Sequence, residues 1–229
     1  MGDSSQNISK EIYQKNLKKG ILIISSIYAI WIIAWMIEQL LELEFGFLST
    51  ETSKFIFWLS AKIFIWIIPG IYLMNISKIK IPLFNLHLLR QAISWGIGIG
   101  LILGSITLLI KLLKHQPFIF NSFTLTFLSG VIITPIFEEF LFRGAILMIL
   151  KQHYGFIKAN IFTSILFLGM HLPGWYFQGK LLINLTDTIE LSLSIFLLSL
   201  VFGYVAKKSG TIIGSILTHI LNNFFTIKI

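Results

Sequence analysis

The sequence contains no cysteine and has few charged residues. Only 12% of its 229 residues are charged, compared with about 25% in ordinary soluble domains. The lack of cysteine excludes disulfides, thiolate metal sites and a cysteine nucleophile. The apolar share is 55%, and the longest polar stretch is the N-terminal one from Met1 to Gly20, so no separate water-soluble domain fits. The composition therefore indicates a membrane protein with several spans.

The net charge of +8 does not indicate nucleic-acid binding. The basic residues stand singly or in pairs at the ends of apolar runs, where lysine and arginine act as interfacial anchors and topology signals. The first apolar run follows several lysines, as the core of a signal peptide would. It extends from Gly20 to about Leu41, which is too long for a signal peptide, and it has no small-x-small cleavage site. We interpret it as a retained first span.

Seven apolar runs are long enough to cross about 30 Å of hydrocarbon. The fourth exceeds one perpendicular crossing and contains Pro135, which removes a backbone hydrogen bond, so we expect a kink or a new segment there. The prediction is an all-α, polytopic membrane bundle of about seven transmembrane helices, or eight if the fourth run divides. The runs lie at residues 20–41, 55–76, 88–110, 122–150, 157–173, 188–206 and 211–228.

The distribution of lysine and arginine predicts the orientation of the chain. Cytoplasmic connections hold the excess of these residues. We therefore predict a multi-pass protein of the cell membrane with a cytoplasmic N-terminus. The residues assigned to the cytoplasmic side are Lys10, Lys15, Lys18, Lys19, Lys78, Lys80, Arg90, Arg143, Lys151, Lys158, Lys207 and Lys208, and those assigned to the opposite side are Lys54, Lys111, Lys114 and Lys180.

The stretch T-P-I-F-E-E-F-L-F-R-G places three ionisable side chains inside an apolar run. Each costs about 2.5 to 3.5 kcal/mol near the centre of a bilayer, so each requires a reason. Glu139 and Arg143 are four residues apart and can pair on one helical face. Glu138 points about 100° away from that face. Taken alone, the pattern fits a structural polar cluster as well as a reactive site.

Two later runs contain further polar side chains. The fifth run includes F-L-G-M-H, from Phe167 to His171. The seventh includes H-I-L-N-N, in which His219 and Asn223 share one helical face. Alone, His171 would be an interfacial residue, and the pair in the seventh run would be a contact between helices.

The first three runs offer less chemistry. Glu38 and Lys62 are interpreted as anchors or helix contacts, because a long side chain can extend toward the membrane interface. Gly96 and Gly100 form a G-x-x-x-G spacing, which permits close packing between helices.

The three polar sets resemble the motifs of the CAAX-protease and bacteriocin-processing family of intramembrane proteases, also called CPBP or Abi. These motifs are E-E-x-x-x-R, F-x-x-x-H and H-x-x-x-N, and no motif position departs from them here. The resemblance covers about residues 118–229. We therefore divide the chain into a cytoplasmic tail at 1–19, N-terminal transmembrane helices at 20–117 and a protease core at 118–229. The resemblance implies a site sunk in the membrane and open toward the cytoplasmic side.

The resemblance also implies an intramembrane endopeptidase that hydrolyses membrane-associated peptides or proteins. The chain has no cysteine and no serine in a recognisable nucleophile motif, so water is the expected nucleophile. On this interpretation Glu138 is the general base and His171 holds the same water. His219 and Asn223 would donate hydrogen bonds to the oxyanion.

Two alternatives remain within this chemistry. Glu139 and Arg143 would fix the helix and the orientation of Glu138, although direct participation of Glu139 is an alternative, because sequence does not rank adjacent acids. The family has been described both as glutamate-type and as metalloproteases, and Glu138, His171 and His219 would supply the ligands of a catalytic zinc. The chain lacks H-E-x-x-H, so no cofactor is favoured and zinc stays the alternative.

The expected partners are the lipid bilayer and a membrane-bound peptide or protein substrate. The alternative function is a non-catalytic bacteriocin-immunity or regulatory membrane protein, since some members of the family are thought to act by binding. A proton-coupled transporter is a further alternative, but no internal repeat relates the two halves of the chain.

Overall fold

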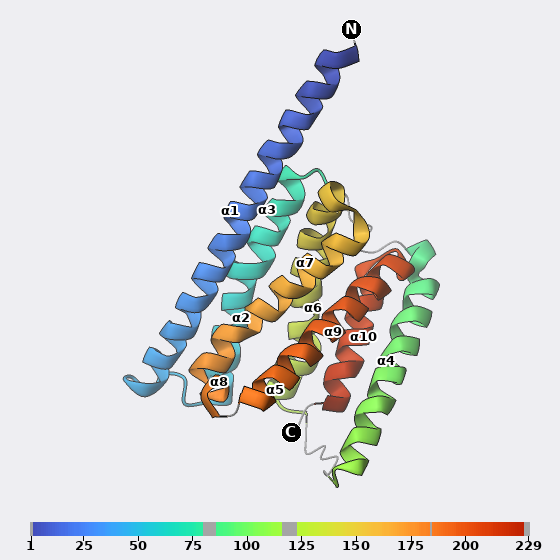
Figure 1. Ribbon diagram of the computed structural model, residues 1–229. Helices are drawn as coiled ribbons and strands as arrows, with labels where there is room; N and C mark the ends of the chain where they lie inside the picture. The colour runs from blue at the N-terminus through green and yellow to red at the C-terminus, as the bar shows by residue number, and fades with distance from the viewer. Residues whose placement is uncertain (1, 80–85, 116–122, 184, 227–229) are drawn as a thin grey trace.

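The computed structural model describes residues 2–79, 86–115, 123–183 and 185–226, and all regular structure within these ranges is helical. The predicted all-α, polytopic bundle is therefore confirmed (Figure 1). Lys80 and the predicted boundary at residue 117 lie outside the described residues. The α-helices are α1 (Gly2–Leu43), α2 (Glu51–Lys62), α3 (Ile68–Ile76), α4 (Leu89–Leu113), α5 (Leu125–Phe127), α6 (Thr134–Glu139), α7 (Leu147–Phe177), α8 (Lys180–Ile183), α9 (Leu185–Ser209) and α10 (Ile212–Thr226).

Five helical segments of the described chain are long and apolar enough to cross a membrane, and α10 is a shorter apolar helix. The longest of the five is interrupted at Gly155, whose φ of 70° and ψ of 172° lie outside helical geometry. The chain reverses direction at this turn (Figure 1). Divided there, and with α10 added, the apolar segments of the described chain number seven. The five are Leu17–Leu43, Glu51–Ile76, Leu89–Leu113, Leu125–Phe177 and Leu185–Ser209.

Pro135 does not divide the fourth run into two crossings. It lies in the first turn of α6, where its missing N–H costs little. A π-helix, η3 (Leu128–Ile133), precedes α6, and a second, η4 (Phe140–Ile146), follows it. The helical geometry therefore changes on both sides of the two acids, and π-helical turns of this kind are frequent at functional sites.

Side-chain caps and glycines fix several helix ends. Thr50 begins α2, because its hydroxyl accepts the Ser53 N–H at 3.1 Å while the Ser53 hydroxyl accepts the Thr50 N–H at 3.3 Å. Thr124 begins α5, its hydroxyl accepting the Phe127 N–H at 3.1 Å. Gly210, with φ of 71°, forms the short turn between α9 and α10.

The hydrophobic core lies between α1, α7, η4 and the π-helix η1 (Ile63–Ile67). Helix α1 turns one face inward, with Ile27 and Trp31 buried at helical spacing. The Trp31 indole donates to the Met170 carbonyl oxygen at 3.0 Å, which connects α1 to α7. Large apolar side chains remain exposed on the outer faces, for example Phe64 at 68%. Such a surface fits contact with lipid.

The glycines of α4 face α10, as the G-x-x-x-G spacing predicts. Gly96 and Gly100 are buried, and a Cβ at Gly96 would lie only 2.7 Å from the Gly214 carbonyl oxygen. The Thr218 hydroxyl donates to the Gly96 carbonyl oxygen at 3.1 Å. The close contact between these helices holds α10 in place, and α10 contains His219.

Candidate active site

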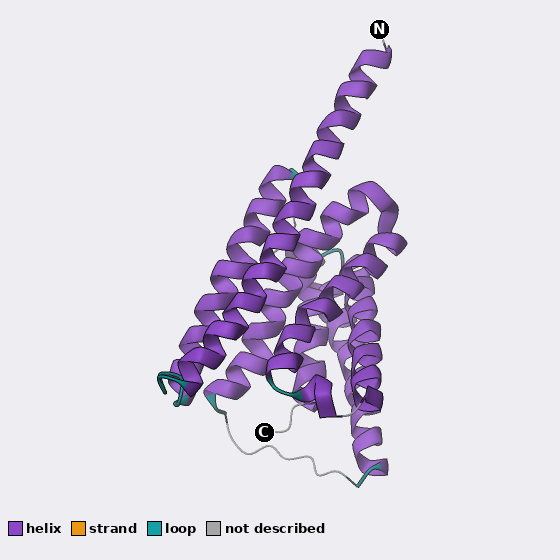
Figure 2. Cartoon of the chain, turned by 60° about the vertical axis from the view of Figure 1, so that its left-hand side comes forward, coloured by secondary structure: helices purple, strands orange, loops and turns teal. Residues whose placement is uncertain are grey.

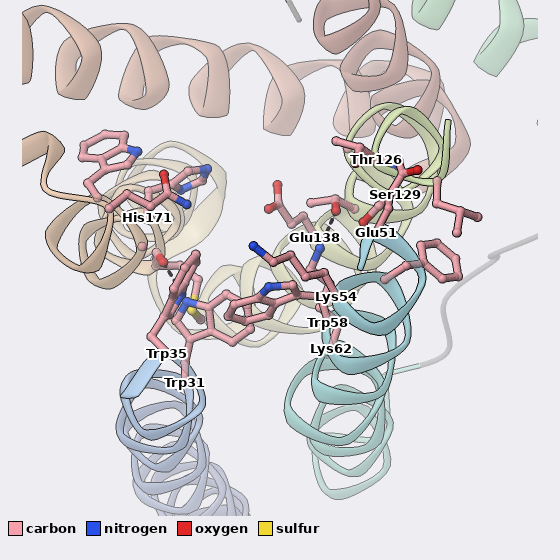
Figure 3. A pocket seen from close by; sticks show the side chains of 18 of the residues that line it. Trp31, Trp35, Glu51, Lys54, Trp58, Lys62, Thr126, Ser129, Glu138 and His171 are labelled. Atoms are coloured by element: carbon pink, nitrogen blue, oxygen red, sulfur yellow. Dashed lines mark hydrogen bonds between the residues drawn. The ribbon is translucent and has the colours of Figure 1, made fainter. Parts of the chain in front are cut away.

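A cavity of about 680 Å³ lies between α1, α2, the α5 to α6 segment and the C-terminal part of α7. Its volume falls in the range of about 300 to 1,000 Å³ that is typical of ligand sites. Glu138 and His171, which come from the fourth and fifth predicted spans, both line it. Figure 3 shows the two side chains coming from different helices on two sides of the cavity.

Glu139 and Arg143 form a fully buried ion pair. Arg143 Nη1 lies 3.0 Å from Glu139 Oε1, and neither side chain is exposed. Arg143 Nη2 donates to the carbonyl oxygen and hydroxyl of Ser199 at 2.7 and 2.6 Å. The guanidinium carbon also lies 4.8 Å from the centre of the Phe167 ring. The predicted pair therefore exists, and these contacts offset part of the cost of burying two charges.

His219 lies between the two glutamates. Its Nδ1 is 3.0 Å from Glu139 Oε1, and its Nε2 is 3.7 Å from Glu138 Oε2. An ionised carboxylate only accepts hydrogen bonds, so Nδ1 donates to Glu139 and Nε2 is the ring nitrogen that faces Glu138. The imidazole stacks on Phe202, with ring centres 4.4 Å apart and planes at 22°. Side chains of the fourth and seventh predicted spans thus meet.

His171 is oriented by its own helix. Its Nδ1 lies 2.8 Å from the Phe167 carbonyl oxygen, which can only accept, so Nδ1 donates. In the neutral ring, Nε2 is then the nitrogen that can accept a hydrogen bond. Phe167 is 2% exposed and packs against the His171 ring at a centroid distance of 4.9 Å. The two residues of the F-x-x-x-H motif therefore act together in orienting the imidazole.

Asn223 reaches the cavity wall through a backbone group. Its Nδ2 donates to the Gly130 carbonyl oxygen at 2.9 Å, and Gly130 lines the cavity. The Asn223 Oδ1 accepts from Asn222 Nδ2 at 3.3 Å. Hydrogen bonds and ion pairs thus connect Glu138, Glu139, Arg143 and His219. His171 shares the cavity with Glu138, and Asn223 is linked to the cavity through Gly130.

Helix α9 contributes two residues that the sequence motifs do not include. Ser199 binds Arg143, and Phe202 stacks on His219. A serine and a phenylalanine in an apolar helix have no motif signal of their own. Their spacing of three residues, which places them on one helical face, is the signal that was available.

Lys62 lies inside the bundle, so its interpretation as an interfacial anchor is wrong and the alternative of a helix contact holds. It is 8% exposed and lines the cavity. Its Nζ donates to Thr134 Oγ1 at 2.5 Å and lies 5.7 Å from the centre of the Trp66 ring. Thr134 and Glu138 are four residues apart on one helical face, and the Lys62 ammonium interacts electrostatically with Glu138.

Four tryptophans of the first two spans form a wall of the cavity, namely Trp31, Trp35, Trp58 and Trp66. Trp35 and Trp58 are the closest pair, with ring centres 4.4 Å apart. The early spans were expected to offer little chemistry, whereas in the structure they build one side of the site. The spacing of four between Trp31 and Trp35 was a usable signal in the sequence.

No three histidine, cysteine, aspartate or glutamate side chains of the described residues are grouped as a metal site. His219 presents both ring nitrogens to glutamates, and His171 uses Nδ1 for a backbone hydrogen bond. A zinc-bound histidine also commonly donates its other ring N–H to a carbonyl or a carboxylate, so zinc stays the alternative.

The fold and the site define a polytopic helical membrane protein with a polar cluster beside an internal cavity. Residues 120–225 match the family model described as type II CAAX prenyl endopeptidase Rce1-like. All six predicted site residues lie within this segment. The segment is therefore similar to the CAAX-protease family, and the resemblance of the motifs is confirmed. A search of curated proteins and a search of solved structures each gave no match.

Proposed function

We propose that this protein is an intramembrane endopeptidase in which Glu138 activates a water molecule. The observation that supports this most directly is the difference between the two acids. Glu138 lines the cavity, whereas Glu139 is unexposed and bound by Arg143 and His219. Two adjacent carboxylates in such different surroundings are suited to different roles. Glu138 is then the base, and Glu139 positions it.

The proposed reaction begins with a water between the Glu138 carboxylate and Nε2 of His171. Glu138 removes a proton as the water oxygen attacks the peptide carbonyl carbon, which forms a tetrahedral oxyanion. His219 Nε2 faces this region and would donate to the oxyanion in the imidazolium form, in which both ring nitrogens carry a proton. The second N–H of the Asn223 amide would be the other donor. Glu138 then returns the proton to the leaving nitrogen as the C–N bond breaks. No step in this scheme passes through a metal.

The proposed substrate is a membrane-bound or amphipathic polypeptide. The cavity lies among membrane-spanning helices, and its wall combines tryptophans with the polar groups around Glu138. A polypeptide whose cleavage point can become extended inside this space satisfies both features. The matching family model is described as a CAAX prenyl endopeptidase, but the cavity alone does not require a prenyl group on the substrate.

The test is cleavage of membrane-anchored peptides by the purified protein in lipid vesicles, followed by mass spectrometry. Glu138→Gln should fold normally and lose cleavage by about 10² to 10⁴-fold, the usual contribution of a general base. His171→Ala should lose activity in the same assay. Glu139→Gln should instead lower the stability of the fold, because it leaves Arg143 without its carboxylate.

A non-catalytic regulatory or immunity protein gives the opposite result. In that case no peptide is cleaved, and Glu138→Gln leaves the biological function of the chain unchanged or lowers its stability. Retention of full cleavage by a folded Glu138→Gln variant would remove the water-activating carboxylate from the proposal.

A further inference from the structure

The cavity opens at the end of the bundle opposite the N-terminus. Its exposed lining residues include Ser49 and Thr50, between α1 and α2. They also include Gln178, which directly follows α7, and Lys180, the first residue of α8. These connections lie beside the C-terminal end of α1, far from the N-terminus (Figures 1 and 2). The inner part of the cavity is lined by Glu138 and other residues of the helices.

Basic residues gather at the other end of the bundle. Four lysines precede the first apolar run within the N-terminal part of α1. The C-terminal end of α3, the turn at Gly155 and the turn between α9 and α10 lie at the same end as the N-terminus (Figure 1). The lysines and arginine near these turns are Lys78, Arg90, Lys151, Lys158, Lys207 and Lys208.

The basic residues at the cavity end are fewer, and two of them are engaged by nearby groups. Lys54 pairs with Glu42 at 2.5 Å, and the ammonium of Lys111 donates to the Phe225 carbonyl oxygen at 2.8 Å. Arg143 is buried in the interior and belongs to neither end. The assignment of Arg143 to the cytoplasmic side is therefore wrong, and the excess of lysine and arginine at the end with the N-terminus rests on the other residues. By the positive-inside rule, the end with more lysine and arginine is cytoplasmic.

We infer that the cavity opens to the non-cytoplasmic face, and that its substrate is an exported or membrane-anchored polypeptide presented at that face. The part concerning the substrate rests on the proposed function, and the part concerning orientation does not. The family resemblance implies a cytoplasmic opening, but a cytoplasmic N-terminus and a cytoplasmic opening are incompatible in this fold. We therefore place the N-terminus in the cytoplasm, as the distribution of lysine and arginine indicates.

The test uses the natural lack of cysteine in this chain. Gln178→Cys places a thiol at the cavity opening, and Gln152→Cys is a matched variant, since both glutamines are exposed and neither is charged. Intact cells are treated with a membrane-impermeant maleimide before and after permeabilisation. We expect Gln178→Cys to react in intact cells and Gln152→Cys to react only after permeabilisation. The reverse pattern, or reaction of both variants in intact cells, would overturn the inference.

Vesicles of known orientation test the substrate side. The membrane-anchored peptides of the cleavage assay are added to the outside of right-side-out and inside-out vesicles that contain the whole protein. Cleavage in right-side-out vesicles alone supports the inference, and cleavage in inside-out vesicles alone contradicts it while leaving the endopeptidase intact. If neither preparation nor detergent-solubilised protein cleaves any peptide, the proposed function fails, and thiol labelling still decides the orientation.

A separate observation concerns Lys62, whose buried ammonium is bound to Thr134 beside Glu138. We infer that Lys62 is a positioning residue, which holds the Glu138 face of α6 against α2 and supplies positive charge near the carboxylate. The hydrogen bond to Thr134 fixes the α2 side of the cavity one helical turn from Glu138. It also holds the Lys62 ammonium where its charge acts on the Glu138 carboxylate. The other charged or titratable groups around Glu138 are Glu139, Arg143, His171 and His219.

The test compares Lys62→Met with Lys111→Met, a matched variant that removes another buried ammonium away from the cavity. Lys62→Met should lower kcat by roughly 10²-fold, the effect of a small misplacement of a catalytic group, with KM little changed and partial rescue in Lys62→Arg. Lys111→Met should lower stability and leave kcat unchanged. Equal kcat in Lys62→Met and the native protein would overturn this role.

A double-mutant cycle of unfolding gives a readout that does not depend on activity. Lys62→Met and Glu138→Gln should be non-additive, because each removes a charge that the other side chain faces. Additive effects would overturn the inference. If Lys62→Met does not fold, Thr134→Val and Thr134→Ser replace it, since only the first loses the hydroxyl that accepts the Lys62 hydrogen bond. Loss of cleavage in Glu138→Gln with full activity in Thr134→Val would retain the endopeptidase and reject the role of Lys62.

Discussion

Replacing Gly96 by alanine would place a methyl group in the contact between α4 and α10. The new Cβ would lie 2.7 Å from the Gly214 carbonyl oxygen and 2.8 Å from Leu217 Cβ. Favourable carbon contacts are about 3.5 to 4.0 Å. One neighbour is backbone and the other is the first atom of a side chain, so neither can move without moving α10. Gly98 provides the matched control, because a Cβ there meets nothing within 4 Å.

The expected magnitude follows from two opposing effects. Alanine at either position gains up to about 1 kcal/mol of helix propensity over glycine. At Gly96 this gain is offset by overpacking, which costs about 1 to 3 kcal/mol. The propensity effect is common to both variants, so their difference in unfolding free energy isolates the packing cost. We expect Gly96→Ala to be less stable than Gly98→Ala by about 1 to 3 kcal/mol.

The assay is reversible unfolding of each purified variant by titration of SDS into a mild detergent. Cleavage activity gives a second readout, because α10 also contains His219. The His219 Nδ1 atom lies 3.0 Å from Glu139 Oε1, and a shift of α10 would lengthen this distance. Gly96→Ala should therefore lose kcat, whereas Gly98→Ala should keep it. If the two variants unfold at the same SDS concentration, the close contact between α4 and α10 does not exist as described.

Three further predictions concern the polar cluster. Arg143→Met should cost about 3 to 5 kcal/mol of stability in SDS unfolding, because it leaves Glu139 buried without its cation, and the double variant with Glu139→Gln should recover part of that loss. Asn223→Ala should lower kcat by roughly 10² to 10³-fold with little change in KM, as expected when an oxyanion donor is removed, and an unchanged kcat would exclude that role. Dialysis against a zinc chelator should leave peptide cleavage unchanged, with elemental analysis of the dialysed protein as the control.

The sequence predicts which polar side chains share a helical face, because this signal is local. Glu139 and Arg143 pair across one helical turn, and His171 lies one turn after Phe167, so the spacing of four residues alone specifies which side chains share a face. The positions of these residues inside apolar runs also distinguish them from surface charges. What the spacing does not specify is the neighbour on another helix, such as Ser199 beside Arg143.

The remaining features depend on contacts between distant segments. In the sequence Lys62 resembles an interfacial anchor, because only its distance from the ends of the apolar run can be judged there. The Thr134 hydroxyl to which it donates lies on another helix, and the sequence does not show that contact. The π-helical turns η3 and η4 also have no sequence signature that periodicity reveals, since each adds about one residue to a helical turn. Proline at position 135 indicated a change of geometry but not its form.

The adjacency of the two acids has a structural consequence besides the proposed catalysis. Glu139 Oε1 lies 3.0 Å from both Arg143 Nη1 and His219 Nδ1, and Arg143 in turn binds Ser199. One carboxylate oxygen therefore connects α6 to η4 and α10, and through Arg143 to α9. A buried ion pair adds little net stability, but it penalises arrangements in which its partners are separated. Because Glu138 is the next residue along the same helix, this network also sets where its carboxylate faces the cavity. An exchange of roles between the two glutamates would require α10 to move, so Glu138→Gln and Glu139→Gln should have different effects even though they delete the same charge.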